Sequence, residues 1–303
     1  MYILQQQLLH LQHIILGKPP YETGWIAWSQ YFKEYGRAVD MLSHKESYKR
    51  DSLDGASVDI FKDVVNYTPI FEQIEKASGI KAYELTPTYS DKRSKRSIRA
   101  DSIDEIIENI EILVNNPEEK FIFAYSDNPD GLLHKYGTDS EEAREYILNA
   151  EIKIKELYDN LPQDTLLIIS ADHGHKNINK PYTLLDYPEI QECLILPASL
   201  ESRCLSFWVK ENMKEEFENR FNKIFESEFW LMTKEEFLEK HLLGFGNKHK
   251  KIDDFIGNYI ALSISDSMIR LETFLAEGKK VKKSTHCGLT KEEMEVPVIV
   301  MKK

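Results

Sequence analysis

The chain has 303 residues, enough for one large domain with an insertion or for two domains. Its 51 acidic and 39 basic residues give a net charge of −12, which argues against a surface that holds a nucleic-acid polymer. Cys193, Cys204 and Cys287 have no CxxC spacing, so they indicate neither a disulfide framework nor a sulfur-ligated zinc, and a reducing cytoplasm is expected. No apolar run is long enough to span a membrane, and the start lacks the basic lead of a signal peptide.

The apolar pattern predicts an α/β fold with a mostly parallel sheet sandwiched by helices. In chain order, the expected elements are a helix at 59–76, a strand at 79–85, a helix at 102–115, a strand at 121–125, a helix at 140–158 and a strand at 165–170. The last three form a strand, helix, strand unit, typical of a right-handed crossover between parallel strands. Both of its strands are short apolar runs, so we expect them to be buried.

The pattern of expected elements changes between about 198 and 249. Plausible strands at 204–209 and 229–232 flank a charged amphipathic helix at 214–226, and Thr233 marks a capped helix start. We predict an inserted α+β cap over 198–249, a core formed by 17–197 and 250–303, and an atypical N-terminal stretch over 1–16.

Three segments far apart in the chain carry candidate metal ligands. They supply Asp130 with His134, Asp172 with His173, and His286. The first two segments follow predicted strands, so both are expected at the edge of a sheet where ligands gather in open α/β folds. Aspartate and histidine are the oxygen and nitrogen ligands that zinc-type ions prefer. The sequence therefore predicts most of a two-metal site.

Neighbouring residues have competing interpretations. Asp127 is an alternative ligand, although its place after a strand favours a turn role. His175 either faces the site or only follows the turn, and His249 is expected to be solvated. Cys287 is expected to be a packed small residue rather than a thiolate ligand, and 92–96 an exposed charged loop rather than a phosphate site.

The order of these motifs resembles the alkaline phosphatase superfamily, and within it the type I phosphodiesterase and nucleotide pyrophosphatase family. The resemblance covers about 17–300 and rests on the segments 20–25, 129–137, 171–174 and 286–297. It implies an alkaline phosphatase-like core and two divalent ions, with zinc expected before manganese. One ion is implied at Asp130, His134 and His286. The other is implied at Asp172 and His173, together with an earlier aspartate and a nucleophilic threonine or serine.

The family's nucleophile region has no match ahead of 17. Residues 1–16 contain no aspartate, serine or threonine, so no residue here inherits the nucleophile's role. A frame-altered or mis-assigned start, suggested by the glutamines at 5–7, and a truncated product are both open explanations.

The resemblance therefore implies a hydrolase of phosphodiester or pyrophosphate bonds whose activity is impaired. Its expected partner is a small phosphorylated substrate such as a nucleotide, and neither a nucleic-acid polymer nor a membrane is expected. A phosphonate hydrolase or phosphomutase-type enzyme of the same superfamily and a catalytically inactive metal-binding protein are the alternatives.

Overall fold

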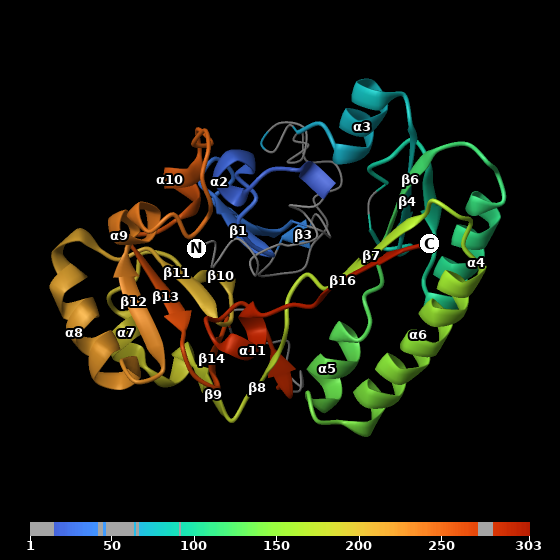
Figure 1. Cartoon of the computed structure of the whole chain (residues 1–303). Helices are drawn as coiled ribbons and strands as arrows, with labels where there is room; N and C mark the ends of the chain where they lie inside the picture. Colours follow the sequence, from blue (N-terminus) through green and yellow to red (C-terminus); the bar gives the residue numbers. More distant parts are fainter. Residues whose placement is uncertain (1–14, 42–44, 47–63, 65–66, 91, 272–280) are drawn as a thin grey trace. The chain divides into compact units, whose positions relative to one another are not determined.

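The computed structural model describes residues 15–41, 45–46, 64, 67–90, 92–271 and 281–303 (Figure 1). The chain divides into two compact units. The first unit contains described residues within 18–67 and 172–295, and the second contains those within 15–17, 68–171 and 296–303. None of the described helices is long and apolar enough to cross a bilayer.

The first unit is built on a seven-stranded antiparallel sheet. In spatial order its strands are β12 (Phe229–Thr233), β13 (Tyr259–Ser263), β11 (Cys204–Phe207), β10 (Ser199–Glu201), β1 (Ser29–Phe32), β2 (Arg37–Asp40) and β3 (Lys45–Glu46). Two short pairs complete it: β14 (Ser267–Arg270) runs parallel to β9 (Lys180–Thr183), and β15 (Ser284–Thr285) runs antiparallel to β8 (Lys176–Asn177).

The core of this unit lies beneath α8 (Lys214–Phe225), the helix labelled α8 at the left of Figure 1. Its Phe217, Phe221 and Phe225 recur every four residues, so they share one face of the helix, and all three are fully buried. They pack with Phe207 of β11 and Phe229 of β12. The remaining helices are short: α2 (Pro20–Thr23), η2 (Leu184–Asp186), α7 (Pro188–Gln191), η3 (Glu211–Met213), α9 (Lys234–Glu239), α10 (Ile252–Phe255) and α11 (Lys291–Met294).

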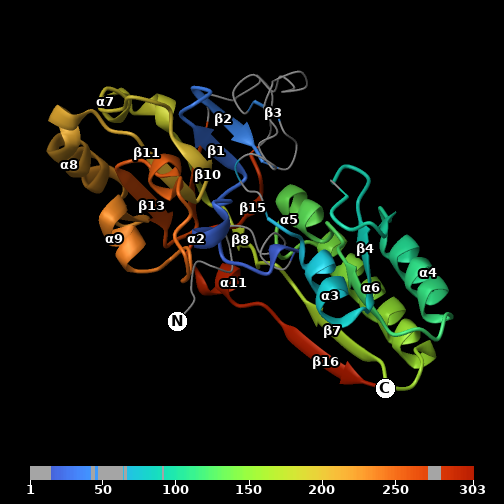
Figure 2. The same cartoon turned by 90° about the horizontal axis from the view of Figure 1, so that it is seen from above.

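The second unit carries a small parallel sheet in the order β5 (Ser97–Arg99), β4 (Lys81–Thr86) and β6 (Lys120–Ala124). Its helices are α3 (Ile70–Ser78), α4 (Ile103–Val114), α5 (Asp130–Tyr136) and α6 (Glu141–Asn160). A separate ribbon forms where β7 (Leu166–Ser170) pairs antiparallel with β16 (Val298–Lys302), which lie side by side in Figure 2.

The positions of the predicted crossover elements are confirmed, since β6, α6 and β7 lie at 120–124, 141–160 and 166–170. The mostly parallel sheet is wrong for the described residues: the largest sheet is antiparallel, and parallel pairing is limited to β5-β4-β6 and β14-β9. Strand β7 pairs with β16 and not with β6. An apolar run marks a strand but carries no information on its partner or direction.

The expected burial of β7 is also wrong. Leu166 and Ile168, on one face of the strand, are each 58% exposed, and Leu167 and Ile169 on the other face are only partly buried. The predicted helix at 59–76 falls partly outside the described residues, and α3 begins only after Pro69. A proline is tolerated at a helix start but not in its interior, which explains that boundary.

The elements expected for the cap are present. Strands β11 and β12 flank α8, and Thr233 forms a reciprocal capping box with Glu236 at the start of α9. Because β10, β11 and β12 belong to the same sheet as β1 and β13, they share one core with those strands. The division into a cap at 198–249 and a core at 17–197 and 250–303 stays a prediction.

One acid group of this unit should make stability depend on pH. The Glu228 side chain is 7% exposed, pairs with Lys180 and accepts a hydrogen bond from Ser267 Oγ at 2.6 Å. Burial by itself would raise the pKa of Glu228, but hydrogen bonds from Lys180, Ser265 and Ser267 lower it from 4.5 to about 2. The ionised form therefore stabilises the fold above about pH 4.5, and this contribution is lost as the pH falls towards 2.

We expect Glu228→Gln to remove about 2 kcal/mol at pH 7, less than the full pKa difference implies because Lys180 is half exposed. Urea unfolding between pH 2.5 and 7 should show a flatter acid limb for this variant. Glu118→Gln, which alters an exposed pair with Lys81, is the control and should leave the curve unchanged. Parallel curves for wild type and Glu228→Gln would contradict the prediction.

Candidate metal centre

Asp130 and His134 lie one turn apart on α5 in the second unit. Their spacing of four residues places both side chains on one helix face, and Asp130 Oδ1 lies 3.4 Å from His134 Nε2. Two ligand atoms on one tetrahedral zinc, each about 2.0–2.1 Å from the ion, are about 3.4 Å apart. The pair therefore has the separation that a shared ion requires.

The loop before α5 gathers negative charge beside this pair. The main-chain carbonyl of Asp127 accepts a hydrogen bond from Gly131 N at 3.3 Å, in agreement with a turn role. Burial, together with the carboxylates of Asp127 and Asp130, raises the pKa of Tyr89. These carboxylates create a negative potential that a bound cation would compensate.

In the first unit, His173 and His286 lie against each other. Their rings are stacked, with centroids 3.7 Å apart and planes inclined by 17°. His173 shortly precedes β8 and His286 directly follows β15, and these strands pair through Thr285 and Lys176. A pairing between segments more than 100 residues apart thus brings two predicted ligands together.

The hydrogen bonds of His173 determine which ring nitrogen can bind an ion. Nδ1 lies 3.0 Å from the carbonyl oxygen of Gly174. A carbonyl only accepts, so Nδ1 carries the proton and Nε2 keeps its lone pair, the arrangement common in metal-binding histidines. Nε2 lies 3.8 Å from Asp172 Oδ2, while Asp172 Oδ1 accepts the main-chain N–H of His173 at 3.1 Å. Asp172 and His173 therefore offer an oxygen and a nitrogen side by side.

His175 joins this histidine group, a role that the sequence left open. Its buried ring lies 5.4 Å from that of His173 and 5.3 Å from that of His286, and Nδ1 is 3.0 Å from Ser284 Oγ. The available signal was the two-residue spacing, because residues i and i+2 of extended backbone point to the same side. His175 is therefore a further candidate ligand or a support for its neighbours.

Cys287 is buried, as expected for a packed small residue, and has φ +79°. This left-handed conformation favours glycine, so a side chain at this position is strained. Burial raises the pKa of its thiol, which keeps the sulfur protonated, and Sγ lies 3.0 Å from His286 Nδ1. The residue contacts the histidine group without offering a thiolate.

Two expectations outside the site are wrong. His249 is half-buried, and its Nε2 lies 3.0 Å from the carbonyl oxygen of Val64, so it is not simply solvated. In the 92–96 loop, Arg93 is buried and lies 3.7 Å from the buried carboxylate of Glu84. Arg96 pairs with Glu75. The loop folds back over β4, so both arginines form ion pairs with carboxylates of their own unit.

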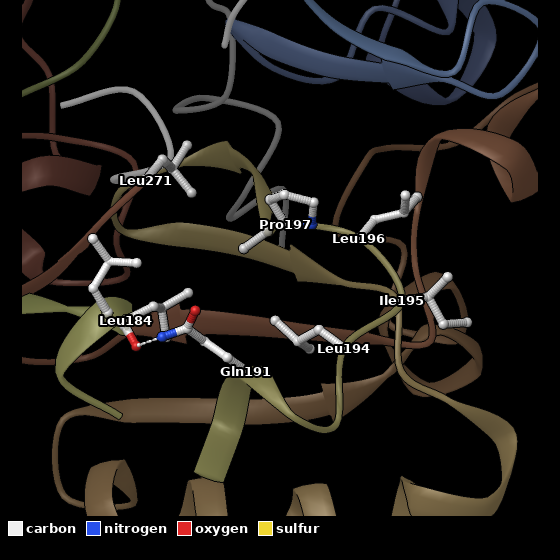
Figure 3. Close-up of a pocket in the computed structure, with 9 residues that line it drawn as sticks. Leu184, Gln191, Leu194, Ile195, Leu196, Pro197 and Leu271 are labelled. Atoms are coloured by element: carbon white, nitrogen blue, oxygen red, sulfur yellow. Dashed lines mark hydrogen bonds between the residues drawn. The ribbon is translucent and has the colours of Figure 1, made fainter. Parts of the chain in front are cut away.

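An apolar cavity of about 230 Å³ lies elsewhere in the first unit (Figure 3). Its lining includes Leu184, Leu194, Ile195 and Leu271, and Gln191 turns its amide to the carbonyl of Leu184 at 2.8 Å. Among the described residues that line it there is no carboxylate or imidazole to bind a divalent ion.

Gly174 is required for the close approach of the two histidine loops. A Cβ built on it would lie 1.9 Å from the carbonyl oxygen of Glu292. Gly257 provides a matched position away from the histidines, because its Cβ would lie 2.2 Å from the carbonyl oxygen of Phe207.

We expect Gly174→Ala and Gly257→Ala each to lower the free energy of unfolding by about 1–3 kcal/mol through backbone displacement. Only Gly174→Ala should also weaken Zn²⁺ binding, by about tenfold or more. Urea titration and calorimetric metal titration measure the two effects. Equal Zn²⁺ affinities in both variants would show that the 174 loop does not position ligands.

Comparison with known proteins identifies the family of this chain. The model of the family "Type I phosphodiesterase / nucleotide pyrophosphatase" matches residues 78–227. No curated protein sequence matches the chain.

Solved structures share the fold. Murine ectonucleotide pyrophosphatase/phosphodiesterase 5 is 15% identical with a TM-score of 0.68, covering 100% of this chain and 78% of that one. An inactive variant of the same murine protein, in complex with AMP, is 14% identical with a TM-score of 0.68 at 99% and 78% coverage. Phosphonoacetate hydrolase from Sinorhizobium meliloti, in complex with phosphonoacetate, is 15% identical with a TM-score of 0.68 at 98% and 79% coverage.

The fold is thus an alkaline phosphatase-like α/β fold. The chain belongs to the type I phosphodiesterase/nucleotide pyrophosphatase family of that superfamily, as its motifs indicated. The assignment of Asp130, His134, His286, Asp172 and His173 to particular ions stays a prediction.

Proposed function

We propose that the protein binds divalent metal ions and belongs functionally to the hydrolases of phosphodiester or pyrophosphate bonds. The observation that carries the proposal is the 3.4 Å separation of Asp130 Oδ1 and His134 Nε2, which suits one shared ion. Family membership supports it independently, since the family uses divalent metals.

The proposed ligand sets follow the sequence motifs. Asp130, His134 and His286 hold one ion, and Asp172 with His173 contribute to the other. Carboxylates neutralise part of the positive charge, while neutral imidazoles add ligands without further anions, a donor set that suits zinc first and manganese second. Two such ions, when bound, stabilise the attacking and leaving oxygens of an in-line displacement at phosphorus. The proposal assigns no nucleophile, and impaired hydrolysis stays a prediction.

We propose a small phosphorylated substrate such as a nucleotide. The structure of the murine relative with AMP supports this choice. The net charge of −12 disfavours a long polyanion, whereas bound ions supply the local positive charge that a single phosphate needs. A phosphonate hydrolase is the second candidate, because the phosphonoacetate hydrolase has the same TM-score of 0.68.

Metal titration and substrate profiling test the proposal together. The full chain, stripped with a chelator, is titrated with Zn²⁺ and Mn²⁺ by calorimetry and then assayed on bis(nitrophenyl) phosphate, nitrophenyl phosphate, a dinucleoside pyrophosphate and phosphonoacetate. We expect Zn²⁺ to bind and the diester or pyrophosphate to be cleaved fastest. Faster cleavage of phosphonoacetate would favour the second candidate. Binding without any cleavage would establish an inactive metal-binding protein, and absence of binding would refute the proposal.

A further inference from the structure

A fully buried ion pair lies in the first unit, in contact with both histidine loops. Arg203 and Glu293 each have 0% side-chain exposure. Arg203 Nε donates to Glu293 Oε1 at 2.7 Å and Nη2 donates to Oε2 at 2.6 Å, so the contact is bidentate. Nη2 also donates to the carbonyl of Ser265 at 2.9 Å, and Nη1 donates to that of Ser267. The charges are thus satisfied without solvent.

Glu293 is bonded to the chain beside each of the stacked histidines. Its main-chain carbonyl accepts the N–H of Gly174 at 2.9 Å, one residue after His173. Its Oε1 accepts the N–H of Gly288 at 2.8 Å, two residues after His286. One residue therefore fixes both loops, through its backbone on one side and its carboxylate on the other.

Arg203 ties this arrangement to the main sheet. It lies just before β11, and its carbonyl accepts the N–H of Ser263, at the end of β13, at 2.8 Å. The space around the pair is fully used, because a Cβ on Gly288 would lie 2.5 Å from Arg203 Nη2 and 2.8 Å from Glu293 Oε2. Because these groups are closely packed, a displacement of the sheet would also displace the loop that carries His286.

We infer that the Arg203–Glu293 pair is a positioning element that holds the imidazoles of His173 and His286 in a fixed arrangement relative to each other, as metal ligands. The inference rests on the proposed function for the ligand role of the two histidines. A buried pair contributes little net stability when compared with apolar residues of the same shape, but it imposes a defined geometry. Ligand support of this kind typically changes metal affinity by about 10–100-fold.

The test compares Glu293→Gln with Glu84→Gln in the full chain. Glu84 is also fully buried and lies beside a buried arginine, Arg93, but it belongs to the second unit and is hydrogen-bonded to neither histidine loop. Both substitutions remove one buried negative charge at nearly constant shape. In the metal-free protein, we expect the imidazole NMR resonances of His173 and His286 to shift in Glu293→Gln and to stay in place in Glu84→Gln. Zn²⁺ affinity should fall at least tenfold only in Glu293→Gln.

Arg203→Lys provides a second variant should Glu293→Gln fail to fold, because lysine keeps the positive charge but cannot form the bidentate contact with Glu293. It should shift the same resonances and weaken Zn²⁺ binding by a smaller factor than Glu293→Gln. Unmoved His173 and His286 resonances, or Zn²⁺ affinities within twofold of wild type, would overturn the inference. If the wild type binds no Zn²⁺, the proposed function fails, and the resonances of the metal-free variants alone decide the positioning role.

Discussion

Replacing His286 with alanine should weaken Zn²⁺ binding by at least about 100-fold, which corresponds to about 2.7 kcal/mol. The imidazole lies in the stack with His173, 3.7 Å between centroids, and is the proposed third ligand of the ion at Asp130 and His134. Loss of a direct ligand should cost more than the loss of a supporting hydrogen bond, and alanine offers no replacement donor. Calorimetric titration of the stripped full chain with Zn²⁺ measures the change.

His241→Ala is the matched control for this experiment. His241 is exposed in the same unit, where its ring lies 4.4 Å from that of Phe245. The His241→Ala variant should bind Zn²⁺ with the affinity of the wild type. Equal affinity in His286→Ala and His241→Ala would remove His286 from the proposed ligand set and leave Asp130 and His134 to be tested alone by Asp130→Asn.

Phe221→Ala should lower the free energy of unfolding by about 3–5 kcal/mol, a large fraction of the stability of a typical domain. Phe221 is fully buried at the centre of the aromatic core, 4.9 Å from the ring of Phe225 and 5.6 Å from that of Phe207. Truncation removes these contacts and leaves a cavity that the surrounding sheet and helix cannot fill. Urea or guanidinium unfolding of the full chain measures the loss.

Phe245→Ala is the corresponding control, since Phe245 is 47% exposed. Its effect should be below about 1 kcal/mol, as is usual for surface substitutions. A comparable loss in both variants would mean that the α8 face does not form the core of the first unit. A change of slope with denaturant, in place of a shifted midpoint, would show that the substitution changes the surface exposed on unfolding or breaks two-state behaviour.

Local patterns located most elements but not their partners. The helical spacing in 140–158 predicted α6, and the apolar runs at 121–125 and 165–170 predicted β6 and β7. The antiparallel contact between β7 and β16 joins residues about 130 positions apart, and neither strand carries a local sign of it. The expectation of a mostly parallel sheet failed for that reason.

The candidate ligands show the same division. Asp130 and His134 were predicted as ligands of one ion only through the family resemblance, and their contact depends on α5, a helix that the sequence analysis did not predict. The stack of His173 with His286 depends on the pairing of β8 with β15 and could be anticipated only through the family resemblance. His175 had a usable two-residue spacing, but its contact with Ser284 required the same pairing.

By itself, the sequence determined the family and the elements whose periodicity is local, because spacing along one helix or strand is read within a few residues. It also supplied the residue types of the proposed metal centre. Only the tertiary structure decided the strand partners, the antiparallel sheet of the first unit and the burial of Arg203 against Glu293, 90 residues away in the chain. Pairing across such separations depends on which surfaces are buried together, and that is a property of the whole folded unit.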